Sequence, residues 1–256
     1  MTRNETGSAD SAASIPDAGG ELGDDDFHES VAGRHRCIDV SQWSDIYVIG
    51  DVHGCREELT QLVALIDPDD DDLLLFVGDL VTKGPDNRGV LDLVRSLPNT
   101  LSVRGNNEDK LLRERKELDS LDDDDLAYID SFPIAISWDA SLVVHGGLDP
   151  RRPLADQDVQ SLLTFRSIPP ENGYDGPFWF EQYRGPPKVY FGHTVLDVPV
   201  DTGGAVGLDT GCVYGGSLTA YDCTRERFLS VPAASTYQDR PDRKFVEHDD
   251  PPTSGR

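Results

Sequence analysis

Five apolar runs of this chain end beside glycine and a residue that can bind a metal ion. The runs are YVIGDVHG, LLLFVGD, LSVRGNNE, LVVHGG and KVYFGH. The candidate ligands are Asp51, His53, Asp79, Asn106, His145 and His193. Two carboxylates, one amide oxygen and three imidazoles suit transition metals. They predict a pair of divalent ions, bridged by one carboxylate at roughly 3.5–4 Å, that would clamp a phosphoryl group and activate water.

The elements that must position these residues alternate between strand and helix in the first half of the chain. IYVI, LLLFV and LSV are each followed by apolar residues at helical spacing, which predicts a parallel βαβαβ unit. In the second half, IAISW and SLVVHG predict an antiparallel hairpin, and KVYFGH, AVGLD and SLTAYDC predict further strands. Ligands gather beyond the carboxyl ends of strands in such sheets. The expected fold is therefore α/β, with mixed sheets and helices outside.

The composition predicts one folded unit between two tails. Residues 1–40 and 234–256 are rich in small and charged residues, so we expect disorder there and a single domain at 41–233. The aspartate runs at 69–72 and 122–125 are expected to be solvated loops and not ligands.

The charge and hydropathy patterns narrow the class of protein. The net charge is -25, with 48 acidic and 23 basic residues, which disfavours binding to nucleic acid. The abundance of aspartate and the scarcity of lysine resemble the composition of proteins from salt-loving microbes. In such organisms, high salt screens the repulsion between like charges on the protein surface. No apolar run is long enough to cross a membrane, and no secretory signal is apparent, so a cytoplasmic location is expected. The four cysteines show no zinc-like spacing.

The ordered motifs GDVHG, GDLVTKGP, GNNE, HGG, FGHT and GLDTGCVYGG resemble those of the calcineurin-like metallophosphoesterases. Within this group they are most similar to the phosphoprotein-phosphatase superfamily branch that holds the symmetric diadenosine tetraphosphatases. The resemblance covers residues 45–216 and implies two mixed β-sheets sandwiched between helices. The implied ligands are Asp51, His53 and Asp79 for one ion, and Asp79, Asn106, His145 and His193 for the other.

Two positions depart from the family pattern. Asn107 replaces the histidine that the family uses as its proposed general acid, and Thr82-Lys83 replaces the Asp-Arg pair of its protein phosphatases. A positioned acid contributes ~10²–10⁴-fold to rate. A phosphate leaving group, whose second pKa is about 6, needs less help than a serine alkoxide. The departures therefore favour phosphoanhydrides or activated esters, with Asn107 still able to donate a hydrogen bond to a phosphate oxygen.

The remaining substrate contacts are expected from cations and aromatic rings. Lys83 matches the position of a phosphate-binding cation of the family. Arg166 is a candidate for gripping a distal phosphate, with a surface arginine as the alternative. Trp179 and Tyr183 would either stack on a base or pack in the core.

The sequence as a whole predicts a metal-dependent phosphohydrolase in which a hydroxide activated by the ions attacks phosphorus in line. The expected substrates are small phosphorylated molecules, namely dinucleoside tetraphosphates or inorganic polyphosphate. Two alternatives stay open: a serine/threonine protein phosphatase acting on phosphoproteins, and a non-catalytic module that binds metal and phosphate. Mn²⁺ is the first expectation for both ions, and Fe, Zn, Co and Ni also fit the ligand set.

Overall fold

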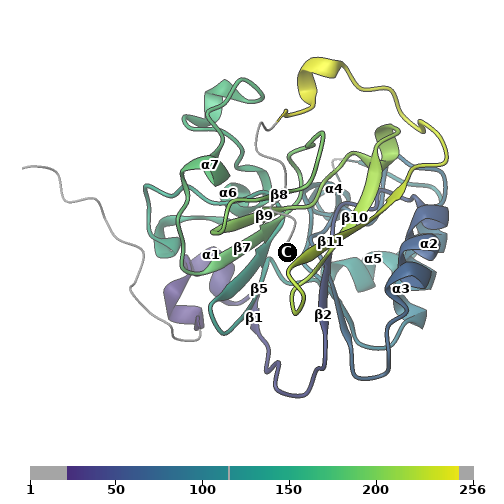
Figure 1. Ribbon diagram of the computed structural model, residues 1–256, viewed down its shortest axis with the longest axis horizontal. Helices are drawn as coiled ribbons and strands as arrows, with labels where there is room; N and C mark the ends of the chain where they lie inside the picture. Colours follow the sequence, from purple (N-terminus) through teal and green to yellow (C-terminus); the bar gives the residue numbers. More distant parts are fainter. Residues whose placement is uncertain (1–21, 115, 248–256) are drawn as a thin grey trace, which may run out of the picture.

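Two β-sheets lie face to face in this protein, and helices cover their outer surfaces (Figure 1). The computed structural model describes residues 22–114 and 116–247. One sheet has six strands in the order β1-β5-β6-β7-β9-β8, and the other has five in the order β11-β10-β2-β3-β4. Both sheets mix parallel and antiparallel pairs. The predicted architecture of two mixed sheets flanked by helices is confirmed.

The five-stranded sheet contains the predicted βαβαβ unit. Its elements are β2 (Ile46–Ile49), α2 (Arg56–Ile66), β3 (Leu73–Phe76), α3 (Asn87–Ser96) and β4 (Thr100–Ser102). The three strands are parallel, and every residue of β2 and β3 is buried, as expected for strands covered on both faces. The antiparallel strands β10 (Ser217–Asp222) and β11 (Arg227–Pro232) complete the sheet beside β2.

The six-stranded sheet is built around the predicted hairpin. Its strands are β1 (His35–Cys37), β5 (Ala135–Trp138), β6 (Ser141–Val144), β7 (Lys188–Phe191), β8 (Val200–Asp201) and β9 (Ala205–Gly207). Strands β5 and β6 pair antiparallel, whereas β6, β7 and β9 run parallel to one another. Helices α1 (Glu29–Ala32), α6 (Val159–Thr164) and α7 (Trp179–Gln182) lie outside this sheet (Figure 1).

Alternate residues of the strands point into different cores. In β2, Tyr47 and Ile49 pack in a cluster with residues of α2 and α3, whereas Ile46 and Val48 pack in a cluster between the sheets. Val143 of β6 enters the same inner cluster from the opposite sheet. Because side chains alternate across a strand, central strands such as β2 and β3 are buried on both faces, which holds their ends in fixed positions.

The folded region extends beyond the predicted limits of 41–233. On the N-terminal side, β1 pairs with β5, and Phe27 and Val31 are buried in the core beneath α6 and α7. On the C-terminal side, Val246 is buried and forms a bridge with Leu196. These elements are short and contain few apolar residues, so composition alone gave no periodic signal. The outer parts of the two predicted tails, 1–21 and 248–256, lie outside the described residues.

The second aspartate run is not a loop, contrary to the expectation. Asp122 caps the N-terminus of α5 (Asp123–Asp130) by accepting a bond from the Asp125 backbone N–H. Asp125 is buried and accepts a 2.6 Å bond from Nη1 of Arg95. Acidic residues at a helix N-terminus accept hydrogen bonds from free N–H groups and interact favourably with the positive end of the helix dipole, so this run starts a helix.

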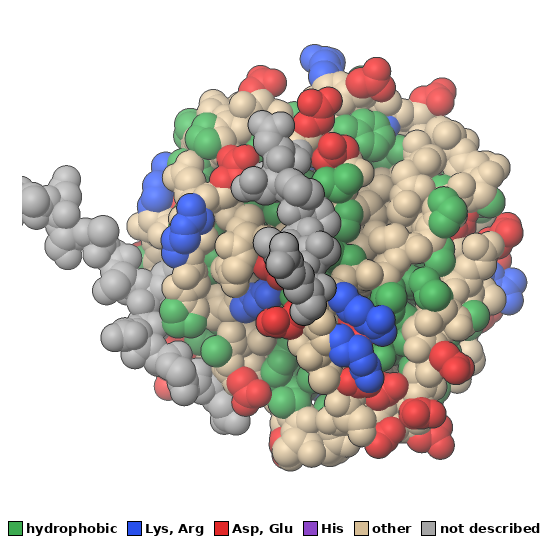
Figure 2. Space-filling view, viewed as in Figure 1, with side chains coloured by type: hydrophobic (Ala, Val, Ile, Leu, Met, Phe, Trp, Pro, Cys, Tyr) green, Lys and Arg blue, Asp and Glu red, His purple; other side chains and the backbone are tan. Residues whose placement is uncertain are grey.

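The surface is acidic, as the composition requires. Figure 2 shows Asp and Glu side chains scattered over one face, with Lys and Arg side chains between them. Within the described ranges, no helix has the length and apolar character needed to cross a membrane.

Candidate metal centre

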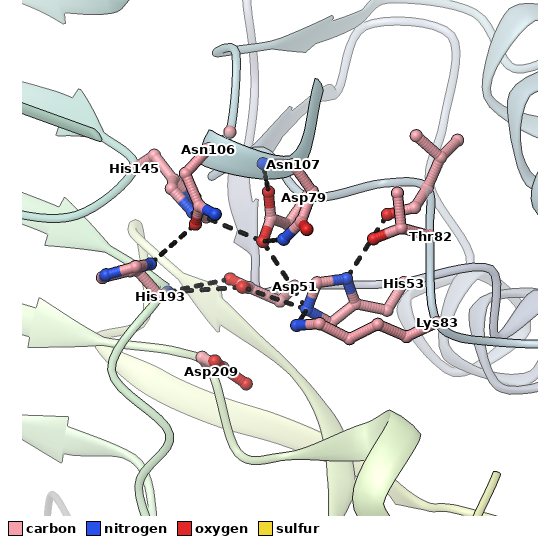
Figure 3. A network of polar contacts seen from close by, with 12 residues as sticks. Asp51, His53, Asp79, Thr82, Lys83, Asn106, Asn107, His145, His193 and Asp209 are labelled. Atoms are coloured by element: carbon pink, nitrogen blue, oxygen red, sulfur yellow. Dashed lines mark hydrogen bonds and ion pairs between the residues drawn. The ribbon is translucent and has the colours of Figure 1, made fainter. Parts of the chain in front are cut away.

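The six predicted ligands meet between the two sheets (Figure 3). They follow the carboxyl ends of β2, β3 and β4 in one sheet and of β6 and β7 in the other. Five of the six are buried, and His193 is partly exposed. The residues meet there because parallel strands bring their carboxyl ends to one edge of each sheet.

Asp79 occupies the middle of the group. Its Oδ2 lies 3.6 Å from Nε2 of His53 and 3.5 Å from Nε2 of His145. Asp51 reaches the same His53 nitrogen at 3.7 Å. Ligand atoms of Asp51, Asp79 and His145 all lie within 4.8 Å of one another. One carboxylate with imidazoles on both sides is suited to bridge two ions.

The Asn106 amide faces the other two imidazoles. Its Oδ1 lies 3.0 Å from Nε2 of His145 and 2.8 Å from Nδ1 of His193. The reversed amide would instead donate its N–H groups to both rings and place its oxygen 2.9 Å from Nζ of Lys110. Because Nε2 of His193 accepts from Arg166, its Nδ1 carries the proton, so the amide oxygen can accept from this ring and from a protonated His145, and the same oxygen can bind a cation. The three groups thus have the chemistry of a ligand set.

Backbone carbonyls orient two of the imidazoles. Nδ1 of His145 lies 2.8 Å from the Val77 carbonyl oxygen, and Nδ1 of His53 lies 3.4 Å from that of Val81. A proton on Nδ1 in each ring leaves Nε2 facing the carboxylates, which is the usual arrangement of a metal-binding histidine. Burial and the Lys83 ammonium lower the pKa of His53 to about 3, so this ring is neutral as a ligand must be.

The buried carboxylates Asp51 and Asp79 make a bound cation favourable at this site. Burial and the nearby Asp209 carboxylate raise the pKa of Asp51 well above its usual range. Burial acts in the same direction on Asp79, but His145 and other positive neighbours hold its pKa well below that range. Burial lowers the pKa of His145, yet Asp79 outweighs it and raises that pKa to about 9. Divalent ions would supply the positive charge that a protonated His145 supplies here.

Three predicted ligands have backbone conformations that side chains rarely adopt. The φ angles are +51° at His53, +52° at Asp79 and +64° at His193. Such positions each cost about 1–3 kcal/mol and concentrate at functional sites. Gly192 matters for another reason: a Cβ atom there would lie 1.9 Å from Oδ1 of Asp51. Because Gly192 has no side chain, the loop after β7 can approach the Asp51 carboxylate, and the backbone nitrogen of His193 lies 3.2 Å from Oδ1 of Asp51.

Two buried acids at the centre were missed by the sequence-based predictions. Glu108 accepts bonds from the backbone N–H groups of Asp79, Val81 and Gly105, at 2.8, 3.1 and 2.9 Å. It therefore fixes the loops after β3 and β4 against each other. Asp209 follows β9 and is 2% exposed. Its position after a strand in GLDTG was the signal that could have found it.

The predicted substrate residues lie against the same ligands. Nζ of Lys83 is 2.6 Å from Nε2 of His53, and Nη2 of Arg166 is 2.7 Å from Nε2 of His193. Asn107 donates from its backbone and side-chain nitrogens to the two oxygens of Asp79, at 2.9 and 2.6 Å. The structure thus brings all nine predicted residues together.

The two aromatic residues considered for base stacking lie in the core. Trp179 is 0% exposed and Tyr183 is 1% exposed, and their rings contact each other with centroids 5.8 Å apart. Packing, the second of the two interpretations, is therefore the one that the structure supports.

A sequence profile of the calcineurin-like phosphoesterases matches residues 44–253 of the chain. The chain belongs to this family. The predicted resemblance is thereby confirmed, and the protein is a metal-dependent phosphohydrolase. Members of the family use divalent metal ions, and the Asp/His group of this phosphoesterase is a candidate for holding them.

Named relatives indicate which members of the family the chain is similar to. A protein from Geobacillus sp. (strain WCH70), named asymmetrical bis(5'-nucleosyl)-tetraphosphatase PrpE, is 28% identical over 244 residues, which span 78% of the phosphoesterase and 99% of that protein. The expected likeness to tetraphosphatases is confirmed. The sequence resemblance pointed to the symmetric enzymes, whereas this name specifies asymmetrical.

Solved structures agree with this placement. A crystal structure provisionally described as a diadenosine tetraphosphatase has a TM-score of 0.71 and 32% identity, covering 78% of the phosphoesterase and 98% of that chain. A serine/threonine phosphatase from Saccharomyces cerevisiae has a TM-score of 0.54 and 18% identity, covering 81% and 84%. The second likeness is one of fold alone.

Proposed function

We propose that the phosphoesterase hydrolyses a phosphoanhydride bond of dinucleoside tetraphosphates. The observation that carries this proposal is Asn107, whose amide donates to Asp79 where the family places a histidine. An amide has no proton to transfer at neutral pH, so the site favours a leaving group that departs without protonation. A nucleotide leaving from an anhydride meets this condition, and a serine alkoxide does not.

We further propose that the six converging residues hold two divalent ions. Asp51 and His53 would bind one, Asn106 and His193 with His145 the other, and Asp79 both. When bound, the ions would polarise the phosphoryl oxygens and activate a water molecule. Mn²⁺ is the first candidate, and the oxygen and imidazole ligands also accept Fe, Zn, Co and Ni.

Lys83 and Arg166 would bind substrate phosphates. Each donates to an imidazole nitrogen in the structure, and neither has a carboxylate within 4.0 Å among the described residues. When Nε2 of His53 is committed to a metal ion, the Lys83 ammonium needs another acceptor. A phosphate oxygen provides one, as it does for the Arg166 guanidinium beside His193.

The same proposal includes which bond of the substrate is cut, the kind of host and the cellular compartment in which the reaction occurs. A tetraphosphate chain cut near one end gives ATP and AMP, and a central cut gives two ADP molecules. The name of the Geobacillus relative supports the first outcome. The net charge of -25 supports a salt-adapted host, and we expect the enzyme to work in its cytoplasm.

The test compares two substrates with the Mn²⁺-loaded enzyme in molar KCl. Diadenosine tetraphosphate should be cleaved to ATP and AMP, a phosphoserine peptide should not, and Asp79→Asn should lose turnover and metal together. Cleavage of the peptide instead would identify a protein phosphatase. Two bound metals with neither substrate cleaved would favour the non-catalytic module.

A further inference from the structure

Three cations and two tyrosines form a continuous arc beside the metal centre. In order, the members of this cation–tyrosine arc are Lys83, Tyr214, Arg240, Tyr174 and Arg166. The Lys83 ammonium lies 5.3 Å from the Tyr214 ring centroid, and the Arg240 guanidinium lies 4.7 Å from the same ring. Arg240 and Arg166 share the Tyr174 ring at 5.2 and 4.1 Å. Each cation is therefore placed against an aromatic face.

Both ends of the arc contact candidate metal ligands. Lys83 contacts His53, and Arg166 contacts His193, as described above. Arg240 stands between them in the arc, because it shares the Tyr214 ring with Lys83 and the Tyr174 ring with Arg166. An anion that extends outward from the metal centre would meet Arg240 next.

Arg240 is held in place by the segment that follows β11. Its Nη2 donates to the Tyr174 hydroxyl at 2.7 Å, and its Nε donates to the Lys244 carbonyl at 3.1 Å. The segment itself is anchored by the Tyr237 N–H on the Val213 carbonyl. Nη1 of Arg240 has no hydrogen-bond acceptor within the described part of the chain. The guanidinium is thus fixed with one edge free.

The charge balance also favours an external anion. The chain has 48 acidic and 23 basic residues, yet Arg240 has no carboxylate within 4.0 Å among the residues that the structure describes. Cations held close together without carboxylate partners are stabilised when a polyanion binds.

We propose that Arg240 forms an outer phosphate subsite that binds the non-reacting phosphates of a polyphosphate chain. The inference rests on the proposed function and names the part of the substrate that this residue recognises. The faces of Tyr174 and Tyr214 are covered by guanidinium and ammonium groups, so they position Arg240 and leave its free edge for phosphate oxygens. A phosphomonoester reaches only the metal centre, Lys83 and Arg166. Arg240 therefore selects polyphosphates over monophosphates.

The kinetic test replaces the guanidinium by an uncharged amide. Arg240→Gln should raise KM for diadenosine tetraphosphate about tenfold with little change in kcat, because a charge-assisted contact to the non-reacting phosphates is lost. Its hydrolysis of p-nitrophenyl phosphate should be unchanged. Arg240→Lys should recover part of the affinity, and the exposed neighbour Arg243→Gln should behave as wild type. Equal losses on both substrates, or no loss on either, would overturn the subsite.

A binding measurement separates this inference from the proposed function. Inorganic tripolyphosphate and orthophosphate are titrated calorimetrically into Mn²⁺-loaded protein at constant free Mn²⁺. Arg240→Gln should weaken tripolyphosphate binding about tenfold and leave orthophosphate binding unchanged. Unchanged tripolyphosphate binding refutes the subsite even if the nucleotide is cleaved. A wild-type enzyme that is inert toward diadenosine tetraphosphate refutes the proposed substrate, while the calorimetric result still decides on Arg240.

Discussion

At the scale of single residues, the candidate centre depends on atoms that approach unusually closely. His53, Asp79 and His193 have left-handed backbones, and Gly192 leaves room for the Asp51 carboxylate. The cost of such conformations is offset by the surrounding structure. Asn107 is the residue at which this centre departs from the family pattern, and its contact with Asp79 makes the departure testable.

Asn107→His should raise the hydrolysis of alkyl phosphoesters at least tenfold, because an imidazole beside Asp79 can donate a proton to the leaving alkoxide. Hydrolysis of diadenosine tetraphosphate should stay within about twofold, since its leaving group needs no proton. Steady-state rates on both substrates measure the effect. Asn107→Gln, which keeps an amide, should give no gain. Equal gains on both substrates would contradict the leaving-group argument.

Gly192→Ala should remove metal and activity while the fold persists. Its Cβ would lie 1.9 Å from Oδ1 of Asp51 and 2.7 Å from Val77, so the carboxylate must move out of the ligand set. We expect at least a tenfold loss of activity, of the size caused by lost metal-site contacts. Bound metal per chain and circular dichroism measure the two effects. Gly33→Ala, where a Cβ meets nothing within 4 Å, is the matched control; full metal content in Gly192→Ala would refute the argument.

At the scale of elements, the segment after β11 has a larger part in the fold than its composition suggests. Val246 is 3% exposed and packs with the outer core. The Ala234 N–H and the Tyr237 hydroxyl both donate to Oε1 of the buried Glu58, each at 2.9 Å. Removing the segment would expose apolar surface and leave that carboxylate without these partners.

A chain that ends at residue 233 should lose about 3 kcal/mol or more of its free energy of unfolding. The estimate combines exposure of one buried valine with loss of the donors to Glu58. Urea denaturation at fixed salt measures the difference. A chain that ends at 247 keeps these contacts and should match the full-length protein. Equal stability of the two shortened chains would show that the segment contributes nothing to the fold.

At the scale of the whole molecule, charge dominates. A net charge of -25 makes the negative side chains of the folded chain repel one another. The positive side chains of Lys83 and Arg166 lie beside the candidate metal centre within this acidic molecule. Long-range repulsion responds to salt, and short contacts between buried groups respond much less.

The thermal midpoint should therefore rise as KCl increases, most steeply at low concentration. The Debye length falls from about 10 Å at 0.1 M to about 3 Å at 1 M, so most of the repulsion is screened within that range. Differential scanning calorimetry of the metal-free protein measures the effect without a contribution from ligand binding. A matched series in sucrose separates screening from general solute exclusion. A midpoint that does not change with KCl would contradict the role of self-repulsion.

The sequence by itself determined the strands that precede the candidate ligands and the identity of those ligands, whereas β1, β8 and β11 were not predicted. These features are local, because each ligand follows an apolar run within a few residues and parallel strands bring such ends together. Tertiary structure alone decided the rest. Glu108 joins the centre through loop packing, and Arg240 joins the cation–tyrosine arc beside it from a segment that composition assigned to a tail. Such contacts join residues far apart in the chain, so no local pattern could predict them.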